Sequence, residues 1–179
     1  MGVYILDLSN VADLVIELDR FYLRTLREAD VSSDYLSWFE DDTVKAYITY
    51  ASKSRTKKEL VEYVNCKNLS ETALLFGVFT KTGSRHIGNI KYEPIELANK
   101  TAEMGILIGD VNWRGRGVGP EVILSSAEWL RDSLGLNYIT LGVESDNSPA
   151  VSAYEKIGFV SDASGFDSIK SGGIRMSLS

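Results

Sequence analysis

The chain carries the stretch Trp113-Arg114-Gly115-Arg116-Gly117-Val118-Gly119-Pro120 between a strand-like apolar run and an amphipathic helix pattern. Glycine adopts positive φ angles readily, so three glycines at alternate positions let several backbone N–H groups converge on one point. The N-terminus of the following helix adds positive partial charge, and this combination binds phosphate. We therefore expect the turn to capture a phosphate or pyrophosphate group, with Arg114 and Arg116 adding positive charge.

The spacing of the glycines excludes two familiar phosphate-binding loops. Pro120 stands where the dinucleotide turn G-x-G-x-x-G requires its third glycine, and no Gly-Lys-Ser/Thr follows as in a P-loop. A tight connection from strand to helix, without any ligand, is the alternative interpretation of these glycines.

Hydrophobic periodicity on both sides of the turn predicts a mixed sheet with helices. We expect strands at residues 21–25, 73–80, 86–92, 102–108, 137–143 and from 159, and helical segments within 31–39, 57–68, 123–134 and 149–156. The strands before the turn follow one another as an antiparallel meander, and strand, helix, strand comes after it. Gly135 is the expected stop of the long helix, and Ser148 is the expected N-cap of the last one, with Pro149 at its first position.

The composition limits the class of protein. With 179 residues, 44% of them apolar, we expect one domain over residues 1–179, in which residues 1–19 form a lead-in of uncertain structure. The formal charge of −6 argues against nucleic-acid binding. No apolar run reaches the roughly 18 residues that cross a membrane, so a cytoplasmic protein without membrane contact is expected. Cys66 and His86 are the only residues of their types, and we expect no disulfide and no metal.

Two linked motifs resemble one enzyme superfamily. Arg114-Gly115-Arg116-Gly117-Val118-Gly119 is similar to the Gln/Arg-x-x-Gly-x-Gly/Ala signature of the GNAT N-acetyltransferases, and residues 147–159 are similar to their N-x-x-A-x-x-x-Y-x-K-x-G-F stretch. Residues 20–49 resemble the opening of the RimJ/RimL-like branch. The resemblance implies the GNAT fold, classed as α/β (α+β): a mixed, mostly antiparallel sheet of six to seven strands flanked by about four helices.

The resemblance also implies acetyl-CoA as cosubstrate. Backbone amides of residues 115–119 would hold the pyrophosphate, because Pro120 has no N–H to give. The pantetheine arm would pair with the backbone of the strand before the turn, and Asn147 would reach it from the other side. The expected cofactor-binding residues are Ile106, Leu107, Ile108, Arg114, Gly115, Arg116, Gly117, Val118, Gly119, Asn147, Ala150 and Tyr154.

The implied reaction is direct attack of a primary amine on the thioester in a ternary complex. The amine must first lose a proton, because only its neutral form is nucleophilic. Glu103 is the expected catalytic base, with Glu93, Glu144 and His86 in reserve, and Tyr154 matches the family tyrosine that hydrogen-bonds the departing sulfur. The alternatives give neither residue a catalytic role: Glu103 is then only a polar residue on a half-exposed strand, and Tyr154 packs in the core.

The acceptor is expected to be a small-molecule amine, with Trp38 from an aromatic-rich segment (residues 35–50) and Tyr92 lining its site. The strand at residues 86–91 resembles an I-G-N-I-K segment of relatives that act on surface-polysaccharide sugars, so a nucleotide-linked amino sugar is the expected acceptor. Other acceptors stay open: a protein N-terminus, a polyamine or another small amine. Two other functions also stay open, a non-catalytic acetyl-CoA sensor and a nucleotide-phosphate binder unrelated to CoA. The chain could form a homodimer.

Overall fold

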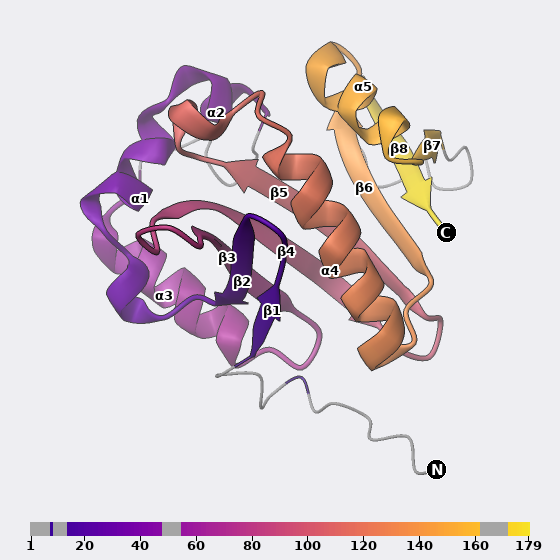
Figure 1. The fold of residues 1–179 in the computed structure, drawn as a ribbon, viewed down its shortest axis with the longest axis horizontal. Coiled ribbons are helices and arrows are strands. Elements are labelled where there is room, and N and C mark those ends of the chain that lie inside the picture. Colours follow the sequence, from indigo (N-terminus) through magenta and orange to yellow (C-terminus); the bar gives the residue numbers. More distant parts are fainter. Residues whose placement is uncertain (1–7, 9–13, 48–54, 162–171) are drawn as a thin grey trace.

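The computed structural model describes residue 8 and residues 14–47, 55–161 and 172–179. These residues form one mixed sheet of eight strands in the order β1-β2-β3-β4-β5-β6-β8-β7, with α4 lying across one face (Figure 1). The expected fold class is confirmed, with eight strands and five α-helices where six to seven strands and about four helices were expected.

The strands agree with the expected order and add two at the ends of the chain. They are β1 (Val15–Glu17), β2 (Phe21–Thr25), β3 (Leu74–Thr80), β4 (His86–Glu96), β5 (Thr101–Ile108), β6 (Tyr138–Glu144), β7 (Val160–Ser161) and β8 (Gly173–Leu178). β1 and β8 were not predicted, and β8 pairs with β6 along its whole length. β4 runs past its expected end because a register shift between Tyr92 and Ile95 lets the pairing with β5 resume.

The helices are α1 (Ser33–Ser37), α2 (Asp42–Tyr47), α3 (Lys57–Asn68), α4 (Val118–Leu134) and α5 (Ser148–Lys156). Helix α3 has the predicted bounds, because Thr56 and Glu59 form a capping box at its start. Helix α5 corrects one expectation: its N-cap is Asn147, whose side chain accepts from the Ala150 N–H, and Ser148 is already helical. No helix in the described ranges is long and apolar enough to cross a membrane.

Strand β3 shows how the sheet is buried on both faces. Leu74, Phe76 and Val78 belong to a core that includes residues of α4, whereas Leu75 and Phe79 belong to a second core with residues of α1 and α3. A strand covered on both faces has apolar side chains at successive positions rather than at alternate ones. This explains the continuous apolar run that the sequence shows there.

Strands β5 and β6 are parallel and pair only over a short stretch. Their register joins Thr101 to Tyr138, Ala102 to Ile139 and Glu103 to Thr140, and no pair follows. From residue 104 onward β5 therefore has a neighbouring strand only on its β4 side, as far as the described residues go. Figure 1 shows β6 running away from β5 toward α5. This separation positions the candidate site.

Candidate active site

The glycine-rich turn follows β5 and leads into α4. Gly115 and Gly117 have φ angles of 70° and 73°, in the left-handed region, and Gly117 is the N-cap of α4 without a side-chain cap. A Cβ atom added at Gly115 or Gly119 would meet no heavy atom within 4 Å. Within the described part of the chain, the N–H groups of residues 115–119 have no hydrogen-bond partner. Open space and unpaired donors fit an anion such as a pyrophosphate.

The two arginines of the turn have different surroundings. The Arg114 guanidinium donates to the carbonyl oxygens of Ile108 at 2.8 Å and Gly109 at 3.1 Å, and to the Asp41 carboxylate at 3.0 Å. Its side chain therefore braces the end of β5 against α2, and its expected share in binding phosphate stays a prediction. Arg116 is exposed, and among the described residues its guanidinium has no partner. Arg116 is the arginine available to a phosphate.

The other residues expected to bind the cofactor lie on β5 beyond its last pair with β6, and at the start of α5. Ile106, Leu107 and Ile108 are half-buried on β5, beyond its last pair with β6. Asn147 and Ala150 lie at the start of α5, which follows β6. The Asn147 side-chain oxygen caps α5 by accepting from the Ala150 N–H, so its amide nitrogen keeps two donors for another partner. The unpaired backbone of β5 and the Asn147 amide thus both offer polar groups.

Tyr154 lies on α5 and is half-buried, with its ring centroid 5.7 Å from that of Phe159. Burial raises the pKa of its hydroxyl above the usual value. No hydrogen bond of this hydroxyl is found among the residues that the structure describes. Tyr154 therefore presents a protonated phenol with its donor unused.

Glu103 is exposed and sits at the last pair of β5 with β6, opposite Thr140. Its carboxylate has no ion pair or hydrogen bond within the described ranges. The strand alternation puts Glu103 on the face opposite its neighbour Met104, which belongs to the core under α4. The carboxylate thus stands where the two strands begin to separate.

Two of the reserve candidates for the base are engaged in other interactions. Burial works to raise the pKa of Glu93, but hydrogen bonds from Lys67 at 2.6 Å and Lys91 at 2.9 Å outweigh it and lower the pKa. Burial lowers the pKa of His86, whose Nε2 lies 2.8 Å from the Asn89 side-chain oxygen. Glu93 is a weak base in an ion-paired cluster, and His86 is neutral and packed among aromatic rings.

Of the two residues expected to line the acceptor site, one lines a cleft and the other does not. Tyr92 is a correction: it is fully buried under α4, and its hydroxyl lies 2.8 Å from that of Ser126. Trp38 is 5% exposed and lines a cleft of about 280 Å³ together with Arg85 and Asp110. Its ring takes up the space beside Gly109, where a Cβ would lie 1.9 Å from Trp38 Cδ2. Residues 48–50 of the aromatic-rich segment lie outside the described residues.

Two parts of the site were not predicted. Arg20 contacts Glu121 and the turn, and β8 places Arg175 beside Thr140, with 3.3 Å between Nη2 and Oγ1. Arg20 is the first residue of the segment that resembles the RimJ/RimL-like branch, but the sequence did not indicate a role for its side chain. Its partner is 101 residues away, and local patterns do not show such contacts.

A turn with unpaired N–H donors follows a strand that separates from its parallel neighbour, and the carboxylate of Glu103 and the phenol of Tyr154 have no partner among the described residues. These features fit an acyl-CoA-dependent acyltransferase. The acetyltransferase (GNAT) domain family matches residues 20–160. The chain therefore belongs to the GNAT acetyltransferases. It is an acetyl-CoA-dependent N-acetyltransferase, and an amine acceptor is implied.

Individual relatives agree with this assignment. The chain is 27% identical over 135 residues to the uncharacterized N-acetyltransferase p20 of Bacillus licheniformis, which covers 75% of this chain and 74% of that protein. The fold is similar to that of RimL, a ribosomal L7/L12 α-N-protein acetyltransferase solved with coenzyme A, with TM-score 0.80, 14% identity, and coverage of 93% and 97%. It is also similar to a spermidine N-acetyltransferase from Vibrio cholerae solved with CoA and spermine, with TM-score 0.75, 22% identity, and coverage of 89% and 95%.

Proposed function

We propose that this chain, acting as one domain, transfers the acetyl group directly to a primary amine in a ternary complex. Glu103 is the base and Tyr154 the hydrogen-bond donor to the sulfur. The observation that carries the proposal is the separation of β5 from β6 immediately after Glu103. At the far end of β5, the N–H donors of residues 115–119 have no partner among the residues that the structure describes. The thioester of acetyl-CoA supplies the activated acyl group.

Each residue then has a defined task. The turn binds the pyrophosphate, and the unpaired edge of β5 orients the pantetheine arm through its backbone. Glu103 accepts a proton from the ammonium form of the acceptor, directly or through water, because an alkylammonium has a pKa near ~10 and is not nucleophilic. The phenol of Tyr154 donates a hydrogen bond to the sulfur. Complete proton transfer would be uphill, since an unperturbed phenol titrates near ~10 and a thiol near ~8.5, and burial raises the Tyr154 pKa further.

The acceptor is best assigned by the charges that it would meet. The centre of the segment that suggested an amino sugar is buried: Gly88, Asn89 and Ile90 lie inside the sheet, away from any acceptor. A nucleotide-linked sugar carries phosphates and needs cationic partners, but Arg85, in the cleft beside Trp38, is paired with Asp110 at 2.9 Å. We propose a phosphate-free primary amine, such as a polyamine or an amino-terminal amine. The nucleotide-linked amino sugar stays a prediction and forms the contrasting arm of the test.

Release of CoA from acetyl-CoA tests the proposal, with spermidine, a serine-initiated peptide and a nucleotide-linked amino sugar as acceptors. We expect turnover with one of the first two. Glu103→Gln should lower kcat by about 100-fold or more, the range for loss of a general base, and leave the Kd of acetyl-CoA unchanged. Glu128→Gln, an exposed position on α4, is the matched control.

Three outcomes contradict parts of the proposal. Tight CoA binding without CoA release on any acceptor would favour a sensor. Turnover restricted to the nucleotide-linked sugar would refute the assignment of a phosphate-free acceptor. A melting temperature raised by ATP and not by CoA would refute the assignment of the turn itself.

A further inference from the structure

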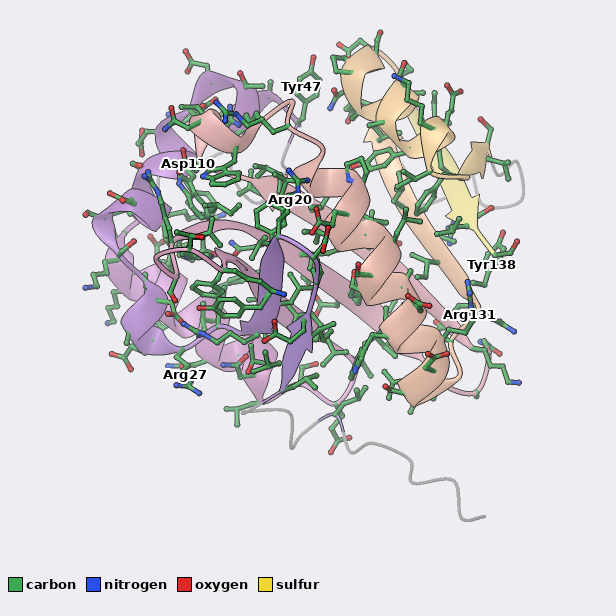
Figure 2. The ribbon with its side chains drawn as sticks, in the orientation of Figure 1. Arg20, Arg27, Tyr47, Asp110, Arg131 and Tyr138 are labelled. Carbon is green, nitrogen blue, oxygen red and sulfur yellow. The ribbon has the colours of Figure 1, made fainter. Side chains whose placement is uncertain are left out.

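Arg20 joins the start of β2 to the beginning of α4. Its backbone N–H donates to Glu121 Oε1 at 2.9 Å, and its Nε donates to Glu121 Oε2 at 2.7 Å. Its Nη1 donates to the carbonyl oxygen of Arg116 at 3.0 Å. The Arg20 carbonyl accepts from the Lys81 N–H at 3.2 Å, so the backbone of Arg20 is itself anchored. Figure 2 shows Arg20 near the end of α4 that follows the turn.

The bond to the Arg116 carbonyl fixes the direction of one donor in the turn. A peptide group is planar and trans, so the Gly117 N–H points away from the Arg116 carbonyl. Gly117, on one side of this peptide, has a φ angle of 73°, in the left-handed region that glycine adopts readily, so no side chain of Gly117 limits the rotation of the peptide. No side chain caps α4 at Gly117. Arg20 therefore holds the peptide that the local sequence leaves free.

Arg20 also neutralises a charge that opposes phosphate binding. Glu121 lies in the first turn of α4, and its side chain is 17% exposed. A carboxylate there would repel a pyrophosphate at the helix N-terminus. The ion pair between the Arg20 guanidinium and Glu121 Oε2 offsets this charge, and the Arg20 backbone N–H satisfies the other carboxylate oxygen. It also keeps Nη2 of Arg20 beside the turn, 3.6 Å from where a Cβ of Gly117 would lie.

We infer that Arg20 is a positioning residue for the CoA pyrophosphate. It lies outside both recognised motifs, holds the Arg116–Gly117 peptide in the orientation that donates, and cancels the charge of Glu121. The inference rests on the proposed role of the turn in binding CoA. Removing Arg20 should therefore weaken recognition of the phosphates without changing the chemistry at the thioester.

Two acyl donors distinguish positioning from general structural support. S-acetylpantetheine shares the thioester and the arm with acetyl-CoA but has no phosphate. In Arg20→Ala we expect KM for acetyl-CoA to rise about tenfold or more, the effect of losing one charge-assisted hydrogen bond. We expect kcat with acetyl-CoA and kcat/KM with S-acetylpantetheine to stay within about twofold of wild type. Equal losses with both donors, or no loss with either, would overturn the inference.

Further variants separate the two tasks of Arg20. Arg20→Ala/Glu121→Gln should recover part of the lost KM, because the uncompensated carboxylate is gone; a double variant as weak as Arg20→Ala would refute the role of charge. Arg20→Lys should lie between wild type and Arg20→Ala, since one ammonium cannot serve both partners. If Arg20→Ala does not fold, Arg20→Gln gives the same comparison.

The controls keep this inference apart from the proposed function. Arg131→Ala removes an equal charge from the other end of α4, where Figure 2 places it, and should change neither KM. If the wild-type protein itself fails to prefer acetyl-CoA over S-acetylpantetheine, the proposed role of the turn is wrong. If the wild type prefers acetyl-CoA and Arg20→Ala keeps that preference, only the role of Arg20 is wrong.

Discussion

Replacing Arg114 and Arg116 one at a time will separate the folding of the turn from its binding of CoA. The Arg114 guanidinium serves the carbonyl oxygens of Ile108 and Gly109 and the carboxylate of Asp41, and its side chain is 28% exposed. A hydrogen bond to a charged group contributes about 1.5–3 kcal/mol, and water replaces part of it at a half-exposed site. We expect Arg114→Ala to lower the free energy of unfolding by about 2–4 kcal/mol.

Arg114→Ala should mainly lower the melting temperature, whereas Arg116→Ala should mainly weaken the binding of CoA. For a chain of this size about 1 kcal/mol corresponds to about 2–4 °C, so Arg114→Ala should melt about 5–15 °C below wild type. Arg116 is exposed, and Arg116→Ala should melt within about 2 °C of wild type. Its Kd for CoA should rise about 5- to 30-fold through the loss of a charge-assisted contact with phosphate. Calorimetric unfolding of the unliganded proteins and titration with CoA measure both quantities.

The opposite pattern would refute this reasoning. If Arg114→Ala keeps the wild-type melting temperature and loses CoA affinity, the side chain of Arg114 faces the phosphates and the bracing role is wrong. Ionic strength supplies a second check. The Kd for CoA should rise with added salt in the wild type and rise less steeply in Arg116→Ala, because one screened contact is already absent.

Other positions give further tests. Tyr154→Phe keeps the ring against Phe159 and removes the hydroxyl, so kcat should fall by about 10- to 1,000-fold with little change in the Kd of CoA; near-wild-type turnover would exclude its role. His86 is the only histidine, and burial holds its pKa below the usual value of about 6.5, so the unfolded chain binds this proton more readily. The free energy of unfolding should therefore fall as the pH drops from about 6.5 toward the folded-state pKa, and a pKa of 6.5 or more by NMR would contradict this. Gly109→Ala would drive a Cβ into the Trp38 ring and should destabilise by about 1–3 kcal/mol; Gly105→Ala, which meets no atom within 4 Å, should unfold like the wild type, and equal stability of the two variants would contradict the close packing.

The fold was predictable where local signals agree. The bounds of α3 and β2 follow from apolar periodicity with clear starts and stops. The missed strand β8 had a signal as well, because Ile174, Met176 and Leu178 alternate with polar residues or glycine. Its short length and the surrounding Ser and Gly residues concealed it. Because β8 was missed, the sequence did not predict a strand paired with β6, nor that Arg175 lies beside Thr140.

The sequence proposes which residues form the candidate site, but it does not show the directions of their side chains. Alternation on β4 puts Tyr92 on the same face as Ile90, yet it does not say that α4 covers that face and brings Ser126 to the Tyr92 hydroxyl. Likewise, the sequence places Arg114 in the turn without showing that its side chain reaches Asp41, 73 residues earlier. Side-chain direction depends on tertiary packing, which no local pattern contains.

If CoA pairs with β5 as proposed, the half-paired edge of that strand should also affect how the protein behaves when its cosubstrate is scarce. Beyond Glu103 the described structure gives that edge no strand on the β6 side, and strand edges of this kind template aggregation. A ligand that completes the edge stabilises the native state by mass action, by about 2.7 kcal/mol at one hundred times its Kd. Amide exchange along β5 should then slow as CoA binds. The lifetime of this chain is therefore expected to follow the supply of acetyl-CoA, so that the metabolite maintains the enzyme that consumes it.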